Sequence, residues 1–302
     1  MKTSLDHLPA DKQQEILAIT EIIKEVAKPE KVILFGSYAT GKYVEDRYVE
    51  DNIVYEYQSD YDFLVVTAQK TGPEYVLKNK IKNVSREFRT PINPIIHDIA
   101  YINEGLSYGQ YFFADIIKEG VLLHDSQTIE FVEQKELTSS EKRAVAQDYY
   151  DQWFQSASRF LKFARFGYSD AIENNDKLND TAFQLHQAAE RFYSAILLVF
   201  TGYKPKTHNL EELRILAKHL SSSLFQLFGF PPDDKNEAHL FELLIRAYVD
   251  ARYKRDYTIS AAETGELIAR MERMKEMVGS ACIAHIKSLW SIKHYFVRIL
   301  YK

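Results

Sequence analysis

Two short motifs near the start of the chain carry residue types suited to phosphate chemistry. Gly36-Ser37 ends an apolar run, so backbone N–H groups at this turn, and at a short helix expected over 38–43, can face an anion. Asp60 and Asp62 open a second apolar run, and residues i and i+2 of a strand share a face, about 6.6 Å apart. Two such carboxylates repel each other unless cations lie between them. The pair is therefore typical of a magnesium site.

Each motif alone also has a plainer interpretation. Strand–Gly–Ser turns are common, and Asp is frequent where a strand begins in solvent. Together, however, a phosphate-binding turn and a metal-binding pair on successive strands predict one site. The 22 residues between Ser37 and Asp60 would then form an insertion inside that site.

The composition narrows the class of protein. The chain has 302 residues, 46% apolar and 27% charged, which is enough for two ordinary globular domains. A net charge of −5 argues against general binding to nucleic acid or anionic membranes. Cys282 is the only cysteine, so an intrachain disulfide and a CxxC zinc site are excluded. The polar N-terminus lacks the apolar core of a signal peptide, and we expect a cytoplasmic protein without membrane contact.

The first part of the chain alternates predicted helices and strands. The expected helices cover 10–27, 74–89 and 107–119, and the expected strands cover 31–36, 60–67, 92–99 and 120–125. Residues 47–57 are predicted to form two short strands that turn at Glu50-Asp51-Asn52. We therefore expect an α/β (α+β) domain over residues 1–126, with a small mixed sheet backed by helices.

From about residue 135 the strand signal disappears. Long amphipathic helices are expected over 141–166, 179–200 and 235–254, one or two more over 261–299, and a further helix capped by Asn209. The stripe expected to be buried on the first of these is Val145, Tyr149, Trp153, Ala157, Phe160 and Ala164. These helices predict an all-α bundle domain over 135–302, joined to the first domain by the polar segment 125–140.

The order strand, Gly-Ser, helix and then Asp-Tyr-Asp on an apolar strand resembles the polymerase-β-like nucleotidyltransferases, in their minimal, antibiotic-type branch. The resemblance covers about residues 30–125. It implies that Gly36, Ser37 and Lys42 hold a nucleoside triphosphate, with ATP expected, and that Asp60 and Asp62 bind two Mg²⁺ ions. It also implies that a nucleoside monophosphate passes to a hydroxyl acceptor and that pyrophosphate is released.

The sequence departs from that family in two respects. The family usually places its two motifs closer together than the 22 residues found here. It also carries a third carboxylate on a later strand, where Asn93 stands in this chain and His97 shares its face. We take Asp98 as the candidate third catalytic carboxylate, although its odd spacing from residue 93 puts it on the other face. The alternatives are a hairpin acid (Glu50, Asp51 or Glu56) and a domain that binds nucleotide with little transfer.

Residues 184–213 resemble the HEPN domain, a helical bundle often fused to these nucleotidyltransferases. The resemblance spans about 140–275. Ribonuclease members carry an Arg and a His with four to six residues between them, whereas here four residues separate Arg252 from Tyr257. A tyrosine, with a pKa near 10, is a poor base at neutral pH. The sequence therefore counts against a ribonuclease.

Other polar residues of this half could form an acceptor site. The candidates are His239, Arg246, Asp250, Arg252, Tyr253 and Tyr257. Four of them share a helix face by spacings of 7, 4 and 3, which also fits a polar interface with an Arg246–Asp250 ion pair. His186 and Glu190 lie one turn apart, as a metal pair or a simple helix pair, and His208 falls in a capped turn.

Three hypotheses follow. The first is an Mg²⁺-dependent nucleotidyltransferase whose bundle binds the acceptor, a small hydroxylated molecule or a protein tyrosine, and forms a homodimer. The second is a toxin–antitoxin-like HEPN ribonuclease with a regulatory nucleotidyltransferase domain. The third is a nucleotide sensor without catalysis. The motifs favour a nucleotide and a hydroxyl acceptor over RNA as partners.

Overall fold

Apolar side chains gather in two separate cores, one in each half of the chain. The computed structural model describes residues 1–43, 45–50, 53–230 and 234–297, and the chain divides into two units, Met1–Glu136 and Leu137–Lys302. The side chains of 44–58 and of residues from 290 onward are outside this description. Each unit has its own core, as expected for domains that fold around separate apolar clusters.

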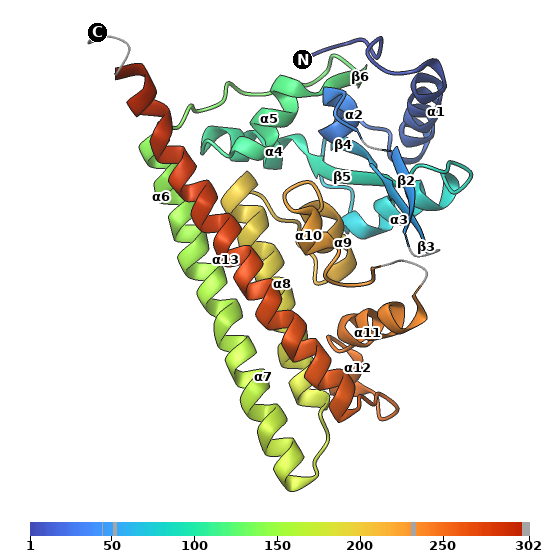
Figure 1. The fold of residues 1–302 in the computed structure, drawn as a ribbon. Helices are drawn as coiled ribbons and strands as arrows, with labels where there is room; N and C mark the ends of the chain where they lie inside the picture. Colours follow the sequence, from blue (N-terminus) through green and yellow to red (C-terminus); the bar gives the residue numbers. More distant parts are fainter. Residues whose placement is uncertain (44, 51–52, 231–233, 298–302) are drawn as a thin grey trace. The chain divides into compact units, whose positions relative to one another are not determined.

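The first unit contains a four-stranded mixed sheet (Figure 1). Its strands are β1 (Lys31–Phe35), β4 (Tyr61–Thr67), β5 (Ile92–Asp98) and β6 (Val121–Asp125), in the order β5-β4-β1-β6. β4 runs parallel to β5, whereas β1 is antiparallel to both β4 and β6. The predicted small mixed sheet is confirmed.

Helices pack on both faces of this sheet. α1 (Ala10–Ala27) and α3 (Glu74–Val84) contact each other and cover one face, while α4 (Ile99–Ser107) and α5 (Tyr111–Glu119) contact the other. The helix expected over 107–119 is confirmed as α5 but begins later, at Tyr111, and α4 was not predicted. Gly109 adopts a φ of 78°, a left-handed conformation that separates α4 from α5.

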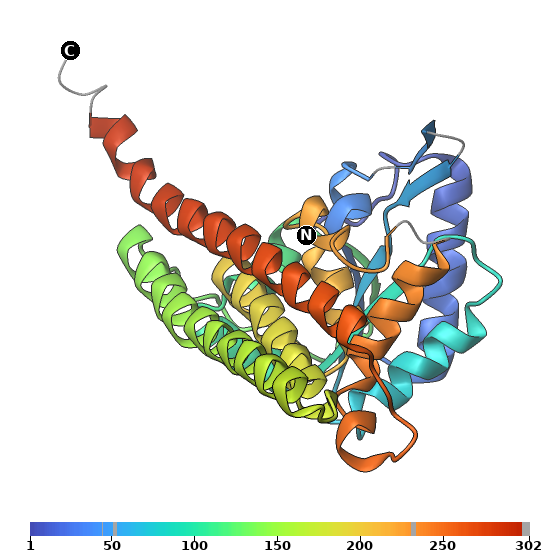
Figure 2. The ribbon, with the colours of Figure 1, turned by 60° about the horizontal axis from the view of Figure 1, so that its bottom comes forward.

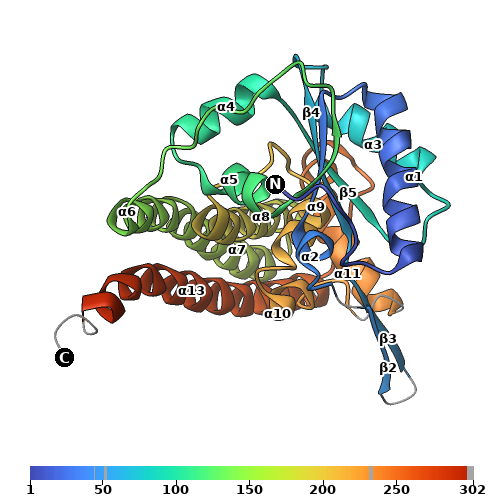
Figure 3. The ribbon, with the colours of Figure 1, turned by 90° about the horizontal axis from the view of Figure 1, so that it is seen from above.

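The segment between the two motifs forms a helix and a separate hairpin. α2 (Gly36–Thr40) is followed by β2 (Glu45–Glu50) and β3 (Ile53–Gln58), which pair only with each other as an antiparallel ribbon. Figure 3 shows this ribbon projecting away from β4 and β5. The predicted hairpin is confirmed, while its turn at Asp51-Asn52 lies outside the described residues.

In the described residues of the second unit, the regular elements are all helices joined by loops. α6 (Ser139–Tyr149) continues through a π-helical turn, Tyr150–Phe154, into α7 (Gln155–Asn174). α8 (Asn179–Thr201) and α13 (Ala261–Val297) run beside α7 in Figure 2, and α8 is buried along most of its length. Within the described ranges, no helix is both long and apolar enough to cross a bilayer.

Most of the expected stripe packs on the core, where Tyr149, Trp153 and Phe160 are partly buried, and the π-helical turn explains the exception at its start. A π turn adds a residue to the helical repeat and rotates what precedes it. As a result Val145 is 36% exposed, while its neighbour Ala146 is fully buried. Ala157 and Ala164, which follow the turn, are buried as predicted.

Shorter helices complete the second unit. They are α9 (Leu210–Ala217), α10 (Ser222–Phe225), α11 (Lys235–Arg246) and α12 (Asp250–Tyr253). The continuous helix expected over 235–254 is wrong, because α11 ends at Arg246 and α12 starts four residues later. Asn209 caps α9 as predicted.

Loss of the Asn209 cap should destabilise the second unit. Its side chain accepts hydrogen bonds from the backbone N–H groups of Glu211 and Glu212. We expect Asn209→Ala to lower the free energy of unfolding by about 1 kcal/mol. Trp153 and Trp290, the only tryptophans, both belong to this unit, so tryptophan fluorescence in urea reports on it. Asn209→Asp keeps a capping oxygen and should stay near wild type; equal losses in the two variants would contradict the cap.

Candidate functional site

The ends of β1 and β4 bring the two motifs together. In the antiparallel register Phe35 lies opposite Asp62, so Gly36 directly follows a residue paired with this aspartate. Gly36 has a φ of +75°, and a Cβ at this position would lie 2.4 Å from Asp62 Oδ2. Only glycine permits both this conformation and this approach. The hairpin does not separate the motifs, because Glu45 pairs with Gln58 and the insertion returns to its starting point.

The parallel register of β4 and β5 adds a third residue. Asn93 lies opposite Asp62, and its Nδ2 donates a hydrogen bond of 3.0 Å to Asp62 Oδ1. Both side chains are buried, with exposed fractions of 2% for Asp62 and 4% for Asn93. Asp60 directly precedes β4 and is also buried. Ser37 Oγ is buried without a hydrogen-bond partner among the described residues.

This donor set fits a magnesium ion that is shared with a phosphate. Mg²⁺ is usually held by one or two carboxylates together with substrate phosphates. The described residues contain no group of three or more His, Cys, Asp or Glu side chains placed to hold a metal, so a cage built from protein ligands alone is not formed there. Asp60 and Asp62 are the residues that would hold the ion, and the buried hydroxyl of Ser37 is available to a phosphate oxygen. α2 has five residues, so its dipole adds little.

Asp98 is not brought to this group. It pairs with Thr67 at the far end of β5, five residues or about 16 Å from Asn93. Its carboxylate accepts a hydrogen bond of 2.9 Å from the backbone N–H of Tyr101 and caps α4. The sequence predicted that Asp98 supplies a third catalytic carboxylate. The structure instead gives this residue a structural role at the start of α4.

The structure describes Lys42 but not the side chains of the hairpin acids. Lys42 follows the C-terminal end of α2, whereas Gly36 begins this helix, and its backbone N–H donates to Ser37 O at 2.9 Å. Its side chain is exposed, and no described contact joins it to Gly36, Ser37 or Asp62. The side chains of the proposed substitute bases lie outside the described part of the chain; these are Glu50, Asp51 and Glu56.

In the second unit, the predicted ion pair is present. Arg246 Nε donates to Asp250 Oδ2 at 2.8 Å, and Lys254 Nζ lies 3.0 Å from Asp250 Oδ1. Arg246, followed by Lys254, holds the pKa of Asp250 below its usual value. His239 instead contacts Glu263 on α13 at 2.8 Å. His239 therefore has a different partner and does not join the Arg246–Asp250 pair.

Tyr257 is a core residue. It is 2% exposed, packs with Ala247 and Ala251, and donates its hydroxyl hydrogen bond to Leu243 O at 3.0 Å. Burial raises its pKa above the usual value of tyrosine. A tyrosine buried in this way cannot serve as an exposed base next to Arg252.

Arg252 and Tyr253 lie on the surface. Arg252 Nε donates to Tyr248 O at 2.7 Å, and its guanidinium lies 4.7 Å from the ring centre of Phe183 and 4.9 Å from that of Tyr248. Tyr253 is largely exposed, with Arg252 also 4.9 Å from its ring centre. Among the six candidate acceptor residues, Arg246 contacts both Asp250 and the ring of Tyr257, at 6.0 Å from its centre, whereas His239 pairs with Glu263 instead.

A second polar cluster joins residues that the sequence presents separately. His208 Nδ1 lies 3.1 Å from Glu190 Oε2, and His186 Nε2 lies 3.9 Å from the same buried oxygen. Tyr248 stacks on both imidazoles, at 4.6 and 5.1 Å between ring centres. His186 Nδ1 donates to Leu244 O at 3.0 Å. The His186–Glu190 spacing was visible in sequence, but no local signal placed His208 and Tyr248 beside it.

Comparison with known families concerns this second unit. Residues 150–281 match the HEPN domain. The predicted HEPN bundle is confirmed for these residues, which include the Glu190 cluster, the Arg246–Asp250 pair and Tyr257. The match leaves the first unit unassigned, and no curated protein matches the chain.

Gly36→Ala tests the approach to Asp62. Gly72 offers a matched control, because its φ is +89° but no atom lies within 4 Å of the position that a Cβ would take. Alanine at a positive φ destabilises by about 1 kcal/mol or more at either position. We expect Gly36→Ala to cost more than Gly72→Ala in thermal unfolding followed by circular dichroism, because its Cβ also meets Asp62. Equal losses would show that Asp62 does not contact residue 36.

His186 should make the HEPN domain less stable at acidic pH. Burial lowers the pKa of His186, so below about pH 6.5 the unfolded chain binds a proton that the folded domain excludes. Stability is then complete above this pH and falls as the pH is lowered, by up to about 1.4 kcal/mol per unit. Urea unfolding by tryptophan fluorescence at about pH 7.5 and 5.5 measures the loss. His186→Gln should reduce it and His239→Gln, at a more exposed position, should not; an unchanged slope in His186→Gln would contradict the assignment.

Proposed function

We propose that the first unit is an Mg²⁺-dependent nucleotidyltransferase that passes a nucleoside monophosphate from a triphosphate, with ATP expected, to a hydroxyl acceptor. The observation that carries the proposal is the contact of Gly36 with Asp62 beside the buried, unpartnered hydroxyl of Ser37. A backbone turn at a positive φ favours glycine, and without a side chain there the backbone can approach a phosphate closely.

The residues have distinct roles in this proposal. Asp60 and Asp62 would hold the two Mg²⁺ ions together with the triphosphate. When bound, the metal supplies positive charge that neutralises the phosphates as the bond to the leaving group breaks. Ser37 donates a hydrogen bond to a phosphate oxygen. Asn93 holds the Asp62 carboxylate through the hydrogen bond to Oδ1 and thus fixes its orientation.

The HEPN domain would bind the acceptor and form a homodimer. The acceptor is a molecule with a reactive hydroxyl, either small or a protein tyrosine. Because Asn93 is an uncharged amide, it cannot take the proton of that hydroxyl. We therefore expect transfer to be slow unless the acceptor brings its own base.

The identity of residue 93 also favours a second candidate, a sensor that binds a nucleotide without transferring it. Asn93 stands where the resembling family has a carboxylate, and it serves as a hydrogen-bond donor to Asp62. The third candidate, a HEPN ribonuclease, is supported by the family match at 150–281. Tyr257, which stands where ribonucleases of that family carry His, is buried and donates its hydroxyl hydrogen bond to Leu243 O, which counts against this candidate.

Label transfer from an α-labelled triphosphate tests the proposal. The full chain is incubated with Mg²⁺, each of four labelled nucleoside triphosphates and a panel of hydroxyl acceptors. We expect label on an acceptor or on the protein, lost by at least about 100-fold in Asp62→Asn because the metal ligand is removed. Asp98→Asn is the matched control and should retain transfer, since this residue only caps α4.

Other outcomes distinguish the alternatives. Nucleotide binding in calorimetry without label transfer or pyrophosphate release identifies the sensor and excludes the transferase. RNA cleavage that persists in Asp62→Asn but is lost in Arg252→Ala identifies the ribonuclease instead.

A further inference from the structure

α7 exposes two phenylalanine side chains on the face that points away from the core of the HEPN domain. Phe163 is 55% exposed and Phe166 is 64% exposed, whereas Leu161 and Ala164, on the opposite side of the helix, are buried in that core. Large apolar side chains that are exposed next to each other are typical of interaction surfaces. This face of α7 is therefore a candidate for contact with a partner.

Charged residues continue this face in both directions along the helix. Two basic residues precede the phenylalanines and two acidic residues follow them, at spacings of three and four residues that put all of them on one side of the helix. We call these six exposed residues the α7 stripe; they are Arg159, Lys162, Phe163, Phe166, Asp170 and Glu173. The stripe is thus basic in its first half, aromatic at its centre and acidic in its second half.

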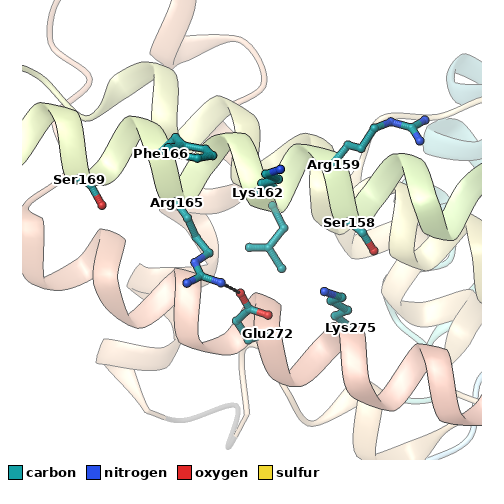
Figure 4. Close-up of a pocket in the computed structure, with 9 residues that line it drawn as sticks. Ser158, Arg159, Lys162, Arg165, Phe166, Ser169, Glu272 and Lys275 are labelled. Atoms are coloured by element: carbon teal, nitrogen blue, oxygen red, sulfur yellow. Dashed lines mark hydrogen bonds and ion pairs between the residues drawn. The ribbon is translucent and has the colours of Figure 1, made fainter.

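The charges of the stripe are not neutralised within the described part of the chain. There, Arg159, Lys162 and Glu173 form no ion pair, and Asp170 accepts a hydrogen bond of 3.1 Å from the uncharged amide of Asn174. By contrast, Arg165, at the border of the stripe, donates to Glu272 of α13 at 3.1 Å. In Figure 4, Arg165 reaches toward α13, whereas Arg159 points away from it. The charges of the stripe are therefore available to a partner.

A groove of about 590 Å³ lies between the stripe and α13. Lys162 and Phe166 line it from α7, and Lys275 lines it from α13, near Ser158 (Figure 4). Among the described residues Lys275 forms no ion pair. The groove therefore adds positive charge beside the basic half of the stripe, where an acidic side chain of a partner can enter.

The stripe is complementary to itself when two copies of α7 run antiparallel. With Phe166 at a two-fold axis, residues equally far before and after it face each other. Arg159 then faces Glu173 of the second copy, and Lys162 faces Asp170. A single register thus forms both charge pairs, and each pair occurs twice because the contact is symmetric. A parallel arrangement would instead put like charges opposite each other.

We propose that the α7 stripe pairs with the α7 stripe of a second copy of this chain, antiparallel and with Phe166 at the two-fold axis. The contact specifies the surface of the homodimer in the proposed function and rests on that part of it, but it does not depend on nucleotide transfer. The phenylalanines bury apolar surface at its centre, and the charge pairs determine its register. From Arg159 to Glu173 the helix extends about 21 Å. This is a short contact for a stable interface, so we expect a micromolar dissociation constant.

Charge reversal in either half of the stripe tests the contact by sedimentation velocity of the full chain. Arg159→Glu with Lys162→Glu should weaken dimerisation by at least about tenfold, because four attractions across the axis become repulsions. Asp170→Lys with Glu173→Lys should weaken it equally, and this pair favours the last turn of α7 through the helix dipole. Circular dichroism checks that each variant is folded. Lys235→Glu with Lys287→Glu makes the same change of charge as the first pair at exposed positions of α11 and α13, and should dimerise like the wild type.

The aromatic centre is tested separately at high salt. At an ionic strength of 1 M the Debye length falls to about 3 Å, so the charge pairs are screened and the apolar contact remains. We expect Phe166→Ala to weaken dimerisation at both about 0.1 M and 1 M salt. The charge reversals should matter much less at 1 M.

A rescue experiment tests the register. Arg159→Glu alone should weaken dimerisation, and adding Glu173→Arg should restore it, because the pair forms again with its signs exchanged. Adding Asp170→Arg instead is the matched control and should not restore it, since this residue faces Lys162 of the second copy.

Three outcomes would overturn the proposal. They are a wild type that stays monomeric up to about 200 µM, double reversals that dimerise like the control pair, and a loss in Arg159→Glu that Glu173→Arg does not restore. A monomeric wild type that binds single-stranded RNA through Arg159 and Lys162 would assign the stripe to nucleic acid instead. Asp62→Asn should dimerise like the wild type, so a failure of nucleotide transfer and a failure of this contact give different results.

Discussion

Strand β4 is the element on which the first unit depends. It pairs with β1 on one side and β5 on the other, and both registers meet at Asp62. The antiparallel partner is Phe35, which puts Gly36 against the carboxylate, and the parallel partner is Asn93. A shift of one residue in either register would turn the side chains of β4 to the opposite face and disperse the site. The apolar residues packed on both sides of the sheet prevent such a shift, so the core also determines the geometry of the site.

The pairing of Asp62 with Asn93 has an electrostatic consequence. Burying a carboxylate is costly unless it is hydrogen-bonded or paired with a cation, and a second carboxylate opposite would add repulsion. The amide of Asn93 offers a donor without charge, which stabilises Asp62 even before any cation binds. In the transferase proposed above, an amide at this position could not accept the proton of the acceptor hydroxyl.

The HEPN domain shows a comparable use of a buried acid. Glu190 lies on α8, a helix buried along most of its length, and its carboxylate is approached by His186 one turn earlier and by His208 from a loop. Tyr248 stacks on both imidazoles and thereby ties the region between α11 and α12 to α8. Tyr248 lies in the interruption of the expected helix, at residues 247–249. Beyond the break, Tyr257 packs in a small apolar cluster with Leu243, Ala247 and Ala251.

Local patterns in the sequence determined most secondary structure. Periodicity identified α1, α8 and the strands of the sheet, the cap at Asn209 and the hairpin, because these depend on neighbours along the chain. Turn chemistry at Gly109 and the π-helical turn at Tyr150–Phe154 were missed, since a few residues without a strong period decide them. The Gly-Ser and Asp-x-Asp motifs, and the order of the HEPN segment, were likewise visible without a structure.

Only the tertiary structure decided which residues meet. Asp98 and Asn93 are both polar residues of one strand, yet β-sheet register places one beside Asp62 and the other at a helix cap about 16 Å away. His208 joins Glu190 across 18 positions, and Tyr257 is buried although its neighbours are polar. Such contacts depend on the pairing of distant segments and on burial, which no local period encodes. The sequence by itself therefore determined the elements and the candidate chemistry, whereas packing determined the site.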